Sequence, residues 1–313
     1  MRCLVTGGAG FIGSHIVDRI LKNGDEVLIY DRFSSGRTLF VEHHAKNKKC
    51  TLVKGDVLDT PKVTEAMKGV DFVFHIASHA NARSGFTDHA IDHMQNLETT
   101  RSVLEAMYTN QVKKIAFAST ALVYGNARVH PTPESYPLEP TSLYAASKAA
   151  SEHYIQAYAS YYDWQAYIFR FAPFFGERHT HGIIYDVVKK IKKNPSILEL
   201  FSDGTPKRAP VYVADGIDAI FKAIDTTHDR VNIFNVGNDE ILTVDEMVDL
   251  ILEAAKVTIK KKYLGGEKDR EDNDFMYVDT KKLKNLGWKP NFSIAEGVKR
   301  TVAYLESNPH LVE

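Results

Sequence analysis

Hydrophobic residues in the first half of the chain follow two alternating patterns. Short, nearly uninterrupted apolar runs are typical of strands buried on both faces of a parallel sheet, and they occur near residues 3–6, 26–30, 51–54, 72–76, 114–118 and 165–170. Between these runs, apolar residues recur at helical spacing near residues 13–23, 61–69, 92–109 and 144–161. The alternation of strand and helix predicts an α/β fold with a doubly wound parallel sheet.

The pattern becomes less regular after about residue 174. Helices are predicted near residues 182–193, 214–224 and 243–256, and strands near 197–201 and 231–236. No internal repeat or low-complexity linker separates this part from the first. We therefore expect one large domain from residues 1–174 with about 211–238, and a smaller C-terminal lobe, built against it, from residues 175–210 and 239–313.

The composition is that of an ordinary globular protein and argues against several classes of function. Of the 313 residues, 44% are hydrophobic and 25% are charged, and the net charge is -1. So small a charge gives no strong field for nucleic acid or an anionic membrane, and no apolar stretch is long enough to span a bilayer. Cys3 and Cys50 cannot form a disulfide framework. We expect a cytoplasmic protein without nucleic-acid or membrane partners.

A glycine-rich segment connects the first predicted strand to its helix. It contains the dinucleotide-binding fingerprint of Rossmann folds, as Gly8-x-Gly10-x-x-Gly13. Glycines in this turn let backbone amides approach a pyrophosphate closely at the helix N-terminus. Asp31, at the end of the second strand, can bind the adenosine ribose and favours NAD over NADP, although two nearby arginines weaken this preference. The expected cofactor is NAD.

Tyr144 and Lys148 are candidate catalytic residues on a predicted helix. Four residues apart, they share one helix face. An ammonium beside a phenol favours the phenolate and lowers the pKa of the tyrosine, which gives an acid–base couple that works near neutral pH. By itself the pair is also compatible with a surface lysine lying along a packed tyrosine. The glycine motif upstream favours the catalytic interpretation.

Together these features resemble the extended short-chain dehydrogenase/reductases of the NAD-dependent epimerase/dehydratase family, over nearly the whole chain. The likeness is also carried by three further segments: Gly55 to Asp59, His75 to Ser78, and Ala118 to Gly125. The resemblance implies that the large domain binds NAD through Gly7, Gly10, Phe11, Ile12, Gly13, Asp31, Asp56, Val57, Ala77, Asn96, Ser119, Tyr144 and Lys148.

The same resemblance implies a catalytic set of Thr120, Tyr144 and Lys148. Tyr144 as a phenolate would take the proton of a sugar hydroxyl while the attached carbon gives a hydride to NAD. Thr120 would bind the same substrate oxygen by hydrogen bonds and spread the charge that develops there. Lys148, with the positive nicotinamide ring, would keep Tyr144 ionised and bind the nicotinamide ribose.

The two residues after Thr120 bear on the fate of the oxidised sugar. Related dehydratases and decarboxylases carry acidic residues there, which serve the elimination of water, whereas this chain has Ala121 and Leu122. We therefore expect inversion at C4 of a UDP-hexose through a 4-keto intermediate, with tightly bound NAD regenerated in each cycle. The alternatives are a nucleotide-sugar reductase, an epimerase of a different sugar, and a non-catalytic NAD-binding protein.

The resemblance also implies a nucleotide-sugar site in the smaller lobe. Arg208 and Arg270 match arginines that bind the nucleotide diphosphate, and Asp272 matches the acidic partner of the second arginine. Pro173 stands where the family usually has an asparagine that contacts the substrate. Met276 lies close to the position that makes room for an N-acetyl group. Its intermediate size leaves hexose and N-acetylhexosamine substrates both open.

Two further expectations concern metals and assembly. No metal site is predicted, because a convincing third ligand is missing from each of three histidine pairs: His75 with His79, His89 with His93, and His179 with His181. Alanines give the helix near 144–161 small faces that permit close packing of another helix. In the family, this helix and the helix of Asn96 form a four-helix dimer interface. We therefore expect a homodimer.

Overall fold

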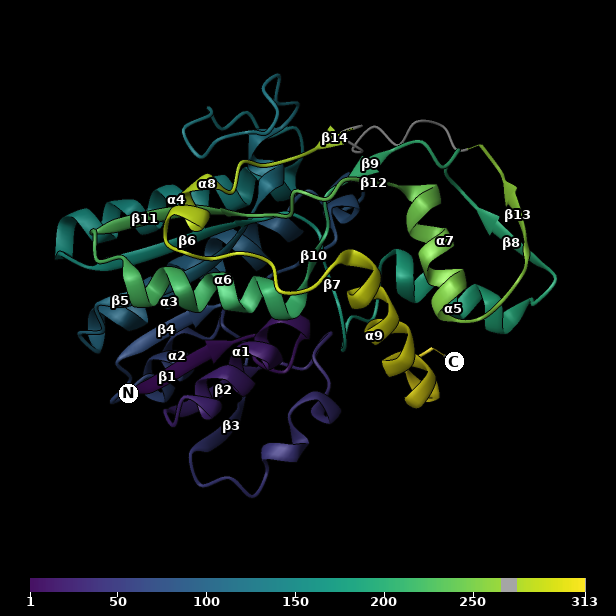
Figure 1. Ribbon diagram of the computed structural model, residues 1–313. Coiled ribbons are helices and arrows are strands. Elements are labelled where there is room, and N and C mark those ends of the chain that lie inside the picture. The colour runs from purple at the N-terminus through teal and green to yellow at the C-terminus, as the bar shows by residue number, and fades with distance from the viewer. Residues whose placement is uncertain (266–274, 313) are drawn as a thin grey trace.

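The computed structural model describes residues 1–265 and 275–312. Its main feature is a seven-stranded sheet with the order β11-β6-β5-β4-β1-β2-β3, in which all neighbouring strands are parallel (Figure 1). The strands are β1 (Arg2–Thr6), β2 (Glu26–Asp31), β3 (Cys50–Lys54), β4 (Phe72–His75), β5 (Lys114–Thr120), β6 (Gln165–Phe171) and β11 (Val231–Val236). The order reverses between β1 and β4, as in a doubly wound Rossmann fold. The predicted fold class is confirmed.

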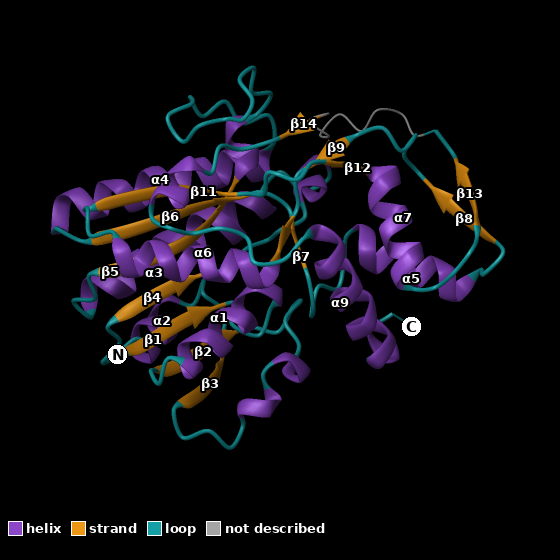
Figure 2. Cartoon of the chain, viewed as in Figure 1, coloured by secondary structure: helices purple, strands orange, loops and turns teal. Residues whose placement is uncertain are grey.

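Helices cover both faces of this sheet (Figure 2). One face packs against α1 (Phe11–Lys22) and α6 (Val213–Thr226), and the other against α2 (Thr60–Ala66), α3 (Thr99–Thr109) and α4 (Leu143–Tyr162). Strand β1 shows the reason, because Cys3 and Val5 belong to the core under α1 and α6, whereas Leu4 belongs to the core under the other helices. The apolar runs of the sequence are therefore strands buried on both faces.

The helix predicted near 92–109 begins with unusual geometry. Residues His93–Glu98 form a π-helix, η4, which α3 continues. Such π segments are rare and often lie at functional sites, and this one contains Asn96. The short 3₁₀ helices are η1 (Thr38–Phe40), η2 (Glu42–His44), η3 (Ala82–Phe86), η5 (Ala121–Tyr124) and η6 (Pro309–Leu311).

The smaller lobe is built around three helices that pack together to one side of the main sheet (Figure 1): α5 (Ile183–Lys193), α7 (Val244–Ala254) and α9 (Ile294–Ser307). Short strands accompany them as the pairs β7 (Phe174–Phe175) with β10 (Val211–Tyr212) and β8 (Ile197–Leu200) with β13 (Lys260–Tyr263), and as a group of β9 (Lys207–Arg208), β12 (Leu242–Thr243) and β14 (Phe275–Met276). Helix α8 (Lys281–Asn285) returns to the large domain and packs against β11.

The path of the chain between the two parts bears on the predicted domain boundaries. After β6 the chain passes through α5 and β8 and then returns to the main sheet with α6 and β11. We therefore propose the division at about residues 174, 211 and 238. Among the described residues, no helix combines the length and the hydropathy needed to cross a bilayer.

Candidate active site

A pocket of about 510 Å³ lies at the carboxyl ends of the main strands. This is where doubly wound sheets bind their ligands. Most of the predicted site residues line it: Gly7, Gly10, Phe11, Ile12, Gly13, Asp31, Asp56, Val57, Ala77, Ser119, Thr120 and Tyr144. Lys148, Asn96 and Arg208 are not among the residues that line it. Arg270 and Asp272 lie outside the described residues.

The glycine turn is packed too closely for side chains. A Cβ atom on Gly13 would lie 2.1 Å from the carbonyl oxygen of Gly7, and Gly7 itself has a φ of +68°. The Gly10 amide donates to the Gly7 carbonyl at 3.0 Å, which closes the turn. In the first turn of α1, the backbone amides have no intrahelical acceptor. They therefore suit the pyrophosphate of a dinucleotide.

Asp31 is held in place by backbone amides. One carboxylate oxygen accepts from the Ala9 amide at 3.0 Å, and the other accepts from the Phe33 amide at 2.7 Å. Burial raises the pKa of Asp31, and these two hydrogen bonds oppose that shift. Each oxygen has a second lone pair that can accept from a ribose hydroxyl. Nearby, Arg32 pairs with Asp56 at 3.1 Å. The position of the Asp31 carboxylate therefore fits the adenosine ribose of NAD.

Tyr144 and Thr120 meet in the pocket from two different elements. Thr120 ends β5, and Tyr144 lies in the first turn of α4, where the hydroxyl of Ser142 caps the helix by accepting from the Ala145 amide at 3.2 Å. Burial raises the pKa of Tyr144 to about 12, the nearby Asp92 carboxylate acts in the same direction, and the hydroxyls of Thr120 and Ser78 oppose it.

Lys148 lies behind the pocket. Its ammonium donates to the carbonyl of Ala118 at 2.8 Å and sits 4.8 Å from the centre of the Phe117 ring. Burial lowers the pKa of Lys148 to about 7, and Glu152 partly opposes this shift. In this structure the groups that lower the pKa of Tyr144 are Thr120 and Ser78. The action of Lys148 on the phenol therefore stays a prediction.

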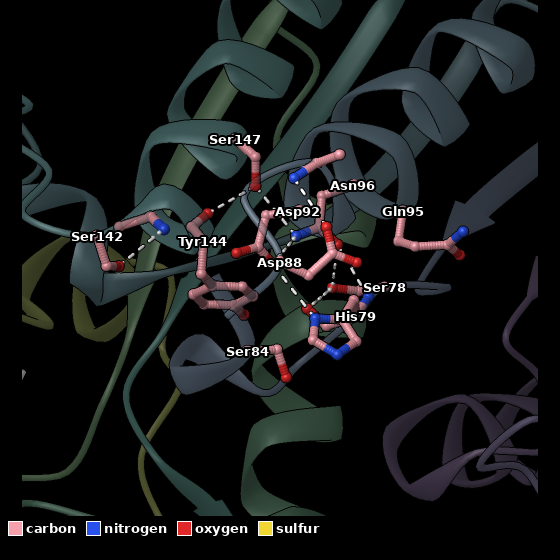
Figure 3. A network of polar contacts seen from close by, with 12 residues as sticks. Ser78, His79, Ser84, Asp88, Asp92, Gln95, Asn96, Ser142, Tyr144 and Ser147 are labelled. Atoms are coloured by element: carbon pink, nitrogen blue, oxygen red, sulfur yellow. Dashed lines mark hydrogen bonds and ion pairs between the residues drawn. The ribbon is translucent and has the colours of Figure 1, made fainter. Parts of the chain in front are cut away.

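Asn96 joins the turn after β4 to α4 (Figure 3). Its side-chain oxygen accepts from the hydroxyl of Ser78 at 3.0 Å and from the amide of His79 at 2.9 Å, and its nitrogen donates to Ser147 at 3.0 Å. Because Ser78 contacts Tyr144, Asn96 positions a neighbour of the candidate catalytic tyrosine. Asn96 itself is buried away from the pocket surface, and its contact with NAD stays a prediction.

Asp92 is a buried acid that the sequence interpretation missed. It lies four residues before Asn96, and its Oδ1 atom is 3.3 Å from Nδ1 of His79 (Figure 3). Among the described residues, its Oδ2 atom has no hydrogen-bond partner. The i, i+4 spacing of Asp92 and Asn96 on one helix face was the available signal.

Ser119 is anchored to a buried ion pair. Its hydroxyl donates to the carboxylate of Glu152 on α4, and Glu152 pairs with Arg170 of β6 at 2.8 Å. Arg170 also donates to the hydroxyl of Tyr124 at 2.9 Å. All four side chains are buried. The group ties the end of β5, and with it Thr120, to α4 and β6.

The lobe-side wall of the pocket is mostly apolar. It includes Pro173, Phe174 and Met276, and two histidines, His179 and His181. Arg208 on β9 donates to the carbonyl of Lys207 at 2.8 Å and is not part of this wall. A role for Arg208 in diphosphate binding stays a prediction.

The histidine pairs considered from sequence do not form three-ligand clusters within the described residues. His75 is buried and lies 2.8 Å from the hydroxyl of Thr6. The cluster with metal-ligand spacing in the described part of the chain consists of Asp18, His43 and His44. Arg178 forms an ion pair with Asp18 at 2.8 Å, and this positive charge disfavours a cation there.

Comparison with known proteins identifies the family. Residues 3–237 match the NAD dependent epimerase/dehydratase family. The chain belongs to this family, its cofactor is NAD, and it is an NAD-dependent nucleotide-sugar epimerase/dehydratase.

The relatives include both epimerases and dehydratases. A Methanocaldococcus jannaschii protein that is provisionally named a UDP-glucose 4-epimerase is 34% identical, over 97% of this chain and 98% of its own length. The UDP-glucose 4-epimerase of Mycolicibacterium smegmatis is 31% identical, with 98% and 99% covered. The dTDP-D-glucose 4,6-dehydratase of Mus musculus is 29% identical, with 99% and 90% covered.

The similar solved structures also include both epimerases and dehydratases. The UDP-glucose 4-epimerase of Thermotoga maritima, solved with UDP-glucose, superposes with a TM-score of 0.90 at 30% identity, and 99% of this chain and 100% of the other are covered. The dTDP-glucose 4,6-dehydratase of Streptomyces venezuelae, a double mutant solved with NAD, has a TM-score of 0.89 at 28% identity, with 99% and 98% covered.

Proposed function

We propose that the protein is a 4-epimerase of a UDP-hexose of the UDP-glucose/UDP-galactose type. The observation that carries this proposal is the pair of residues after Thr120. Ala121 is buried and Leu122 lines the pocket, and neither side chain can donate or accept a proton. Elimination of water from the sugar needs both an acid and a base beside the reacting carbons.

The acids that line the described pocket do not supply these groups. They are Asp31 and Asp56, which lie at the ends of β2 and β3, with β1 and β4 between them and β5. Asp92 is near Tyr144 but lies outside the pocket lining. Where the catalytic Thr120 and the residues after it lie, the described site therefore offers one proton-transfer side chain, Tyr144. This suits oxidation and reduction at one carbon.

The proposed mechanism assigns one task to each candidate catalytic side chain. Tyr144, as the phenolate, takes the proton from the C4 hydroxyl and later returns it. Thr120 donates a hydrogen bond to the same oxygen, which fixes its position and stabilises negative charge on it. Lys148, in its protonated form, supplies positive charge behind the tyrosine. Bound NAD, held by the glycine turn and Asp31, would supply the group that takes a hydride from C4 and returns it.

Inversion results when the 4-keto sugar presents its opposite face before the hydride returns. The turning sugar needs space and freedom from strong contacts. The described lobe-side wall, with Pro173, Phe174 and Met276, offers no charged side chain that would hold the sugar in one orientation. Because the redox state of NAD is restored, no second substrate is consumed.

The test is interconversion of nucleotide sugars by the purified protein without added reductant. We expect UDP-glucose and UDP-galactose to interconvert. The N-acetyl forms of both are tested in the same assay. Tyr144→Phe should lower kcat by at least about 100-fold, because it removes the proton-transfer group. Tyr154→Phe is the matched control, since Tyr154 is exposed on the same helix.

Two results would contradict the proposal. One is full activity in Tyr144→Phe. The other is formation of a 4-keto-6-deoxy sugar from dTDP-glucose with no interconversion of UDP-hexoses, which would place the protein among the dehydratases. The substrate set therefore has to include dTDP-glucose.

A further inference from the structure

Two histidines extend the pocket from the glycine turn to the smaller lobe. His179 and His181 lie between β7 and α5, and both line the pocket. The His179 ring stacks on Phe11, the first residue of α1, with 4.4 Å between ring centres and 15° between planes. The His181 ring stands at 70° to His179, with 4.3 Å between their centres. The three rings thus form one contiguous cluster beside the glycine turn, with Phe11 and His179 stacked and His181 edge-on to His179.

The rings of His179 and His181 make packing contacts, but their nitrogens make no hydrogen bonds within the described residues. A Cβ atom on Gly182, which has a φ of +86°, would lie 3.1 Å from Cε1 of His179, so the loop closes against this ring. Within the part of the chain that the structure describes, neither ring nitrogen of His179 or His181 has a hydrogen-bond partner. Other histidines do have one, as His15 shows with the carbonyl of Glu177 at 3.0 Å. Packing fixes the position of each ring, and its nitrogens lie beside the pocket without a partner among the described residues. Such nitrogens can form hydrogen bonds to a bound ligand.

The charge balance of the pocket indicates the chemistry of that ligand. Both NAD and a nucleotide sugar bring a diphosphate. On the described lobe-side wall, the other side chains are apolar, and His179 and His181 are the ones that can donate a hydrogen bond. Burial lowers the pKa of His179 to about 3, so its ring is neutral and carries one N–H donor.

We propose that His179 and His181 form a diphosphate-binding pair on the lobe side of this pocket. The inference rests on the proposed function, because it concerns the ligands of the same site. The diphosphate has two sources, the nucleotide sugar and NAD. In either case each imidazole N–H donates to a phosphate oxygen, while Phe11 holds the His179 ring in place.

The experiment separates binding of the diphosphate from binding of the nucleoside. Calorimetry on the NAD-loaded protein would give Kd for UDP against uridine, and for dTDP against thymidine. NAD retained per protomer after gel filtration would be measured in parallel. The variants are His179→Phe, which keeps the ring stack but removes the N–H donor, and His181→Phe. His228→Phe is the control, because His228 is exposed before β11, at the amino end of that strand.

We expect each pocket variant to weaken a diphosphate ligand by about 10-fold, the cost of one hydrogen bond to a charged group. Loss of affinity for UDP or dTDP, with nucleoside affinity unchanged, assigns the pair to the nucleotide sugar. Loss of NAD assigns it to the cofactor. The inference is overturned if neither changes, or if nucleoside and nucleotide affinity fall equally.

These readouts do not depend on turnover. If the wild-type protein fails to interconvert UDP-hexoses, the proposed function fails while the binding data still decide the role of the histidines. If interconversion succeeds and the variants bind every diphosphate as the wild type does, the histidine inference fails alone.

Discussion

The phenol of Tyr144 lies next to a carboxylate that opposes its ionisation. Asp92 raises the pKa of Tyr144, in addition to the larger effect of burial. The proposed reaction needs the phenolate, so activity should appear as the pH rises through the pKa of Tyr144. Asp92→Asn removes the negative charge and should shift this acidic limb to lower pH by roughly half to one unit. The measurement is the pH profile of kcat/KM for the NAD-loaded enzyme.

Asp88→Asn is the control for this shift. Asp88 is exposed, lies four residues before Asp92, and appears in the same polar network (Figure 3). The asparagine keeps the side-chain oxygen that accepts from the Ala90 amide at 3.0 Å. An acidic limb that stays in place in Asp92→Asn would show that this carboxylate does not tune the tyrosine.

Because the pKa of Lys148 is lowered in the folded protein, we expect the free energy of unfolding of the NAD-free protein to depend on pH. Its pKa falls from the usual 10.5 to about 7 on burial. Between these values the unfolded chain binds more protons at this residue than the folded chain. The free energy of unfolding therefore rises with pH across this window, by about 1.4 kcal/mol per pH unit. Lys148→Met should lack this slope in urea titrations from about pH 7 to 9.5.

Comparison with Lys193→Met corrects for loss of an ordinary lysine, since Lys193 is exposed at the end of α5. Parallel stability curves for the wild type and Lys148→Met would rule out the depressed pKa.

At the scale of single residues, the sequence predicts which residues lie near one another better than it predicts where each side chain points. The i, i+4 spacing placed Tyr144 and Lys148 on one helix face, and the glycine motif located the pocket. The turn of Lys148 toward the carbonyl of Ala118 depends on β5, which is remote in sequence. The stack of His179 on Phe11 joins residues that are far apart in the sequence and has no local pattern.

At the scale of elements, β5, α4 and β6 are held together by the pair of Glu152 and Arg170. Both side chains are buried, so removing one charge leaves the other without compensation. Glu152→Gln should lower the free energy of unfolding by about 3–5 kcal/mol. Chemical denaturation of the variant measures this loss.

The double variant Glu152→Gln with Arg170→Met is the informative comparison. It removes the uncompensated guanidinium and should recover part of the stability. A loss below about 1 kcal/mol in the single variant would mean that the pair is not important for stability. Because Ser119 donates to Glu152 and precedes Thr120, kcat should also fall in the single variant.

The long elements of the main sheet could be predicted because each repeats one pattern over many residues. The strands β7, β9, β10, β12 and β14 have two residues each, which is too short for any periodicity. Helix α9 was missed although its start carries a signal, the capping box of Ser293 and Glu296. The π geometry of η4 has no comparable signature in the sequence.

At the scale of the whole molecule, α3 and α4 expose aromatic side chains. Tyr108, Tyr154, Tyr161 and Tyr162 are each at least 40% exposed, an apolar face that suits a protein partner. We propose that two copies of the chain pair through these helices. Light scattering should give the mass of a homodimer, and Tyr154→Arg should weaken the dimer by about 2 kcal/mol or more.

Phe201→Arg is the matched control for assembly, because Phe201 is 70% exposed at the end of β8 in the smaller lobe. A monomeric wild type would contradict the proposed dimer. Equal dissociation of the dimer in Tyr154→Arg and Phe201→Arg would also contradict the proposed interface.

The position of β11 has a consequence for exchanging parts between relatives. This edge strand joins the main sheet only after the chain has passed through α5 and β8. A single crossover near residue 174 would therefore take the edge strand from a different parent than the rest of the sheet. On the proposed division, a chimaera that changes only the smaller lobe needs three junctions, near residues 174, 210 and 238. On this division the smaller lobe cannot be exchanged as one contiguous segment.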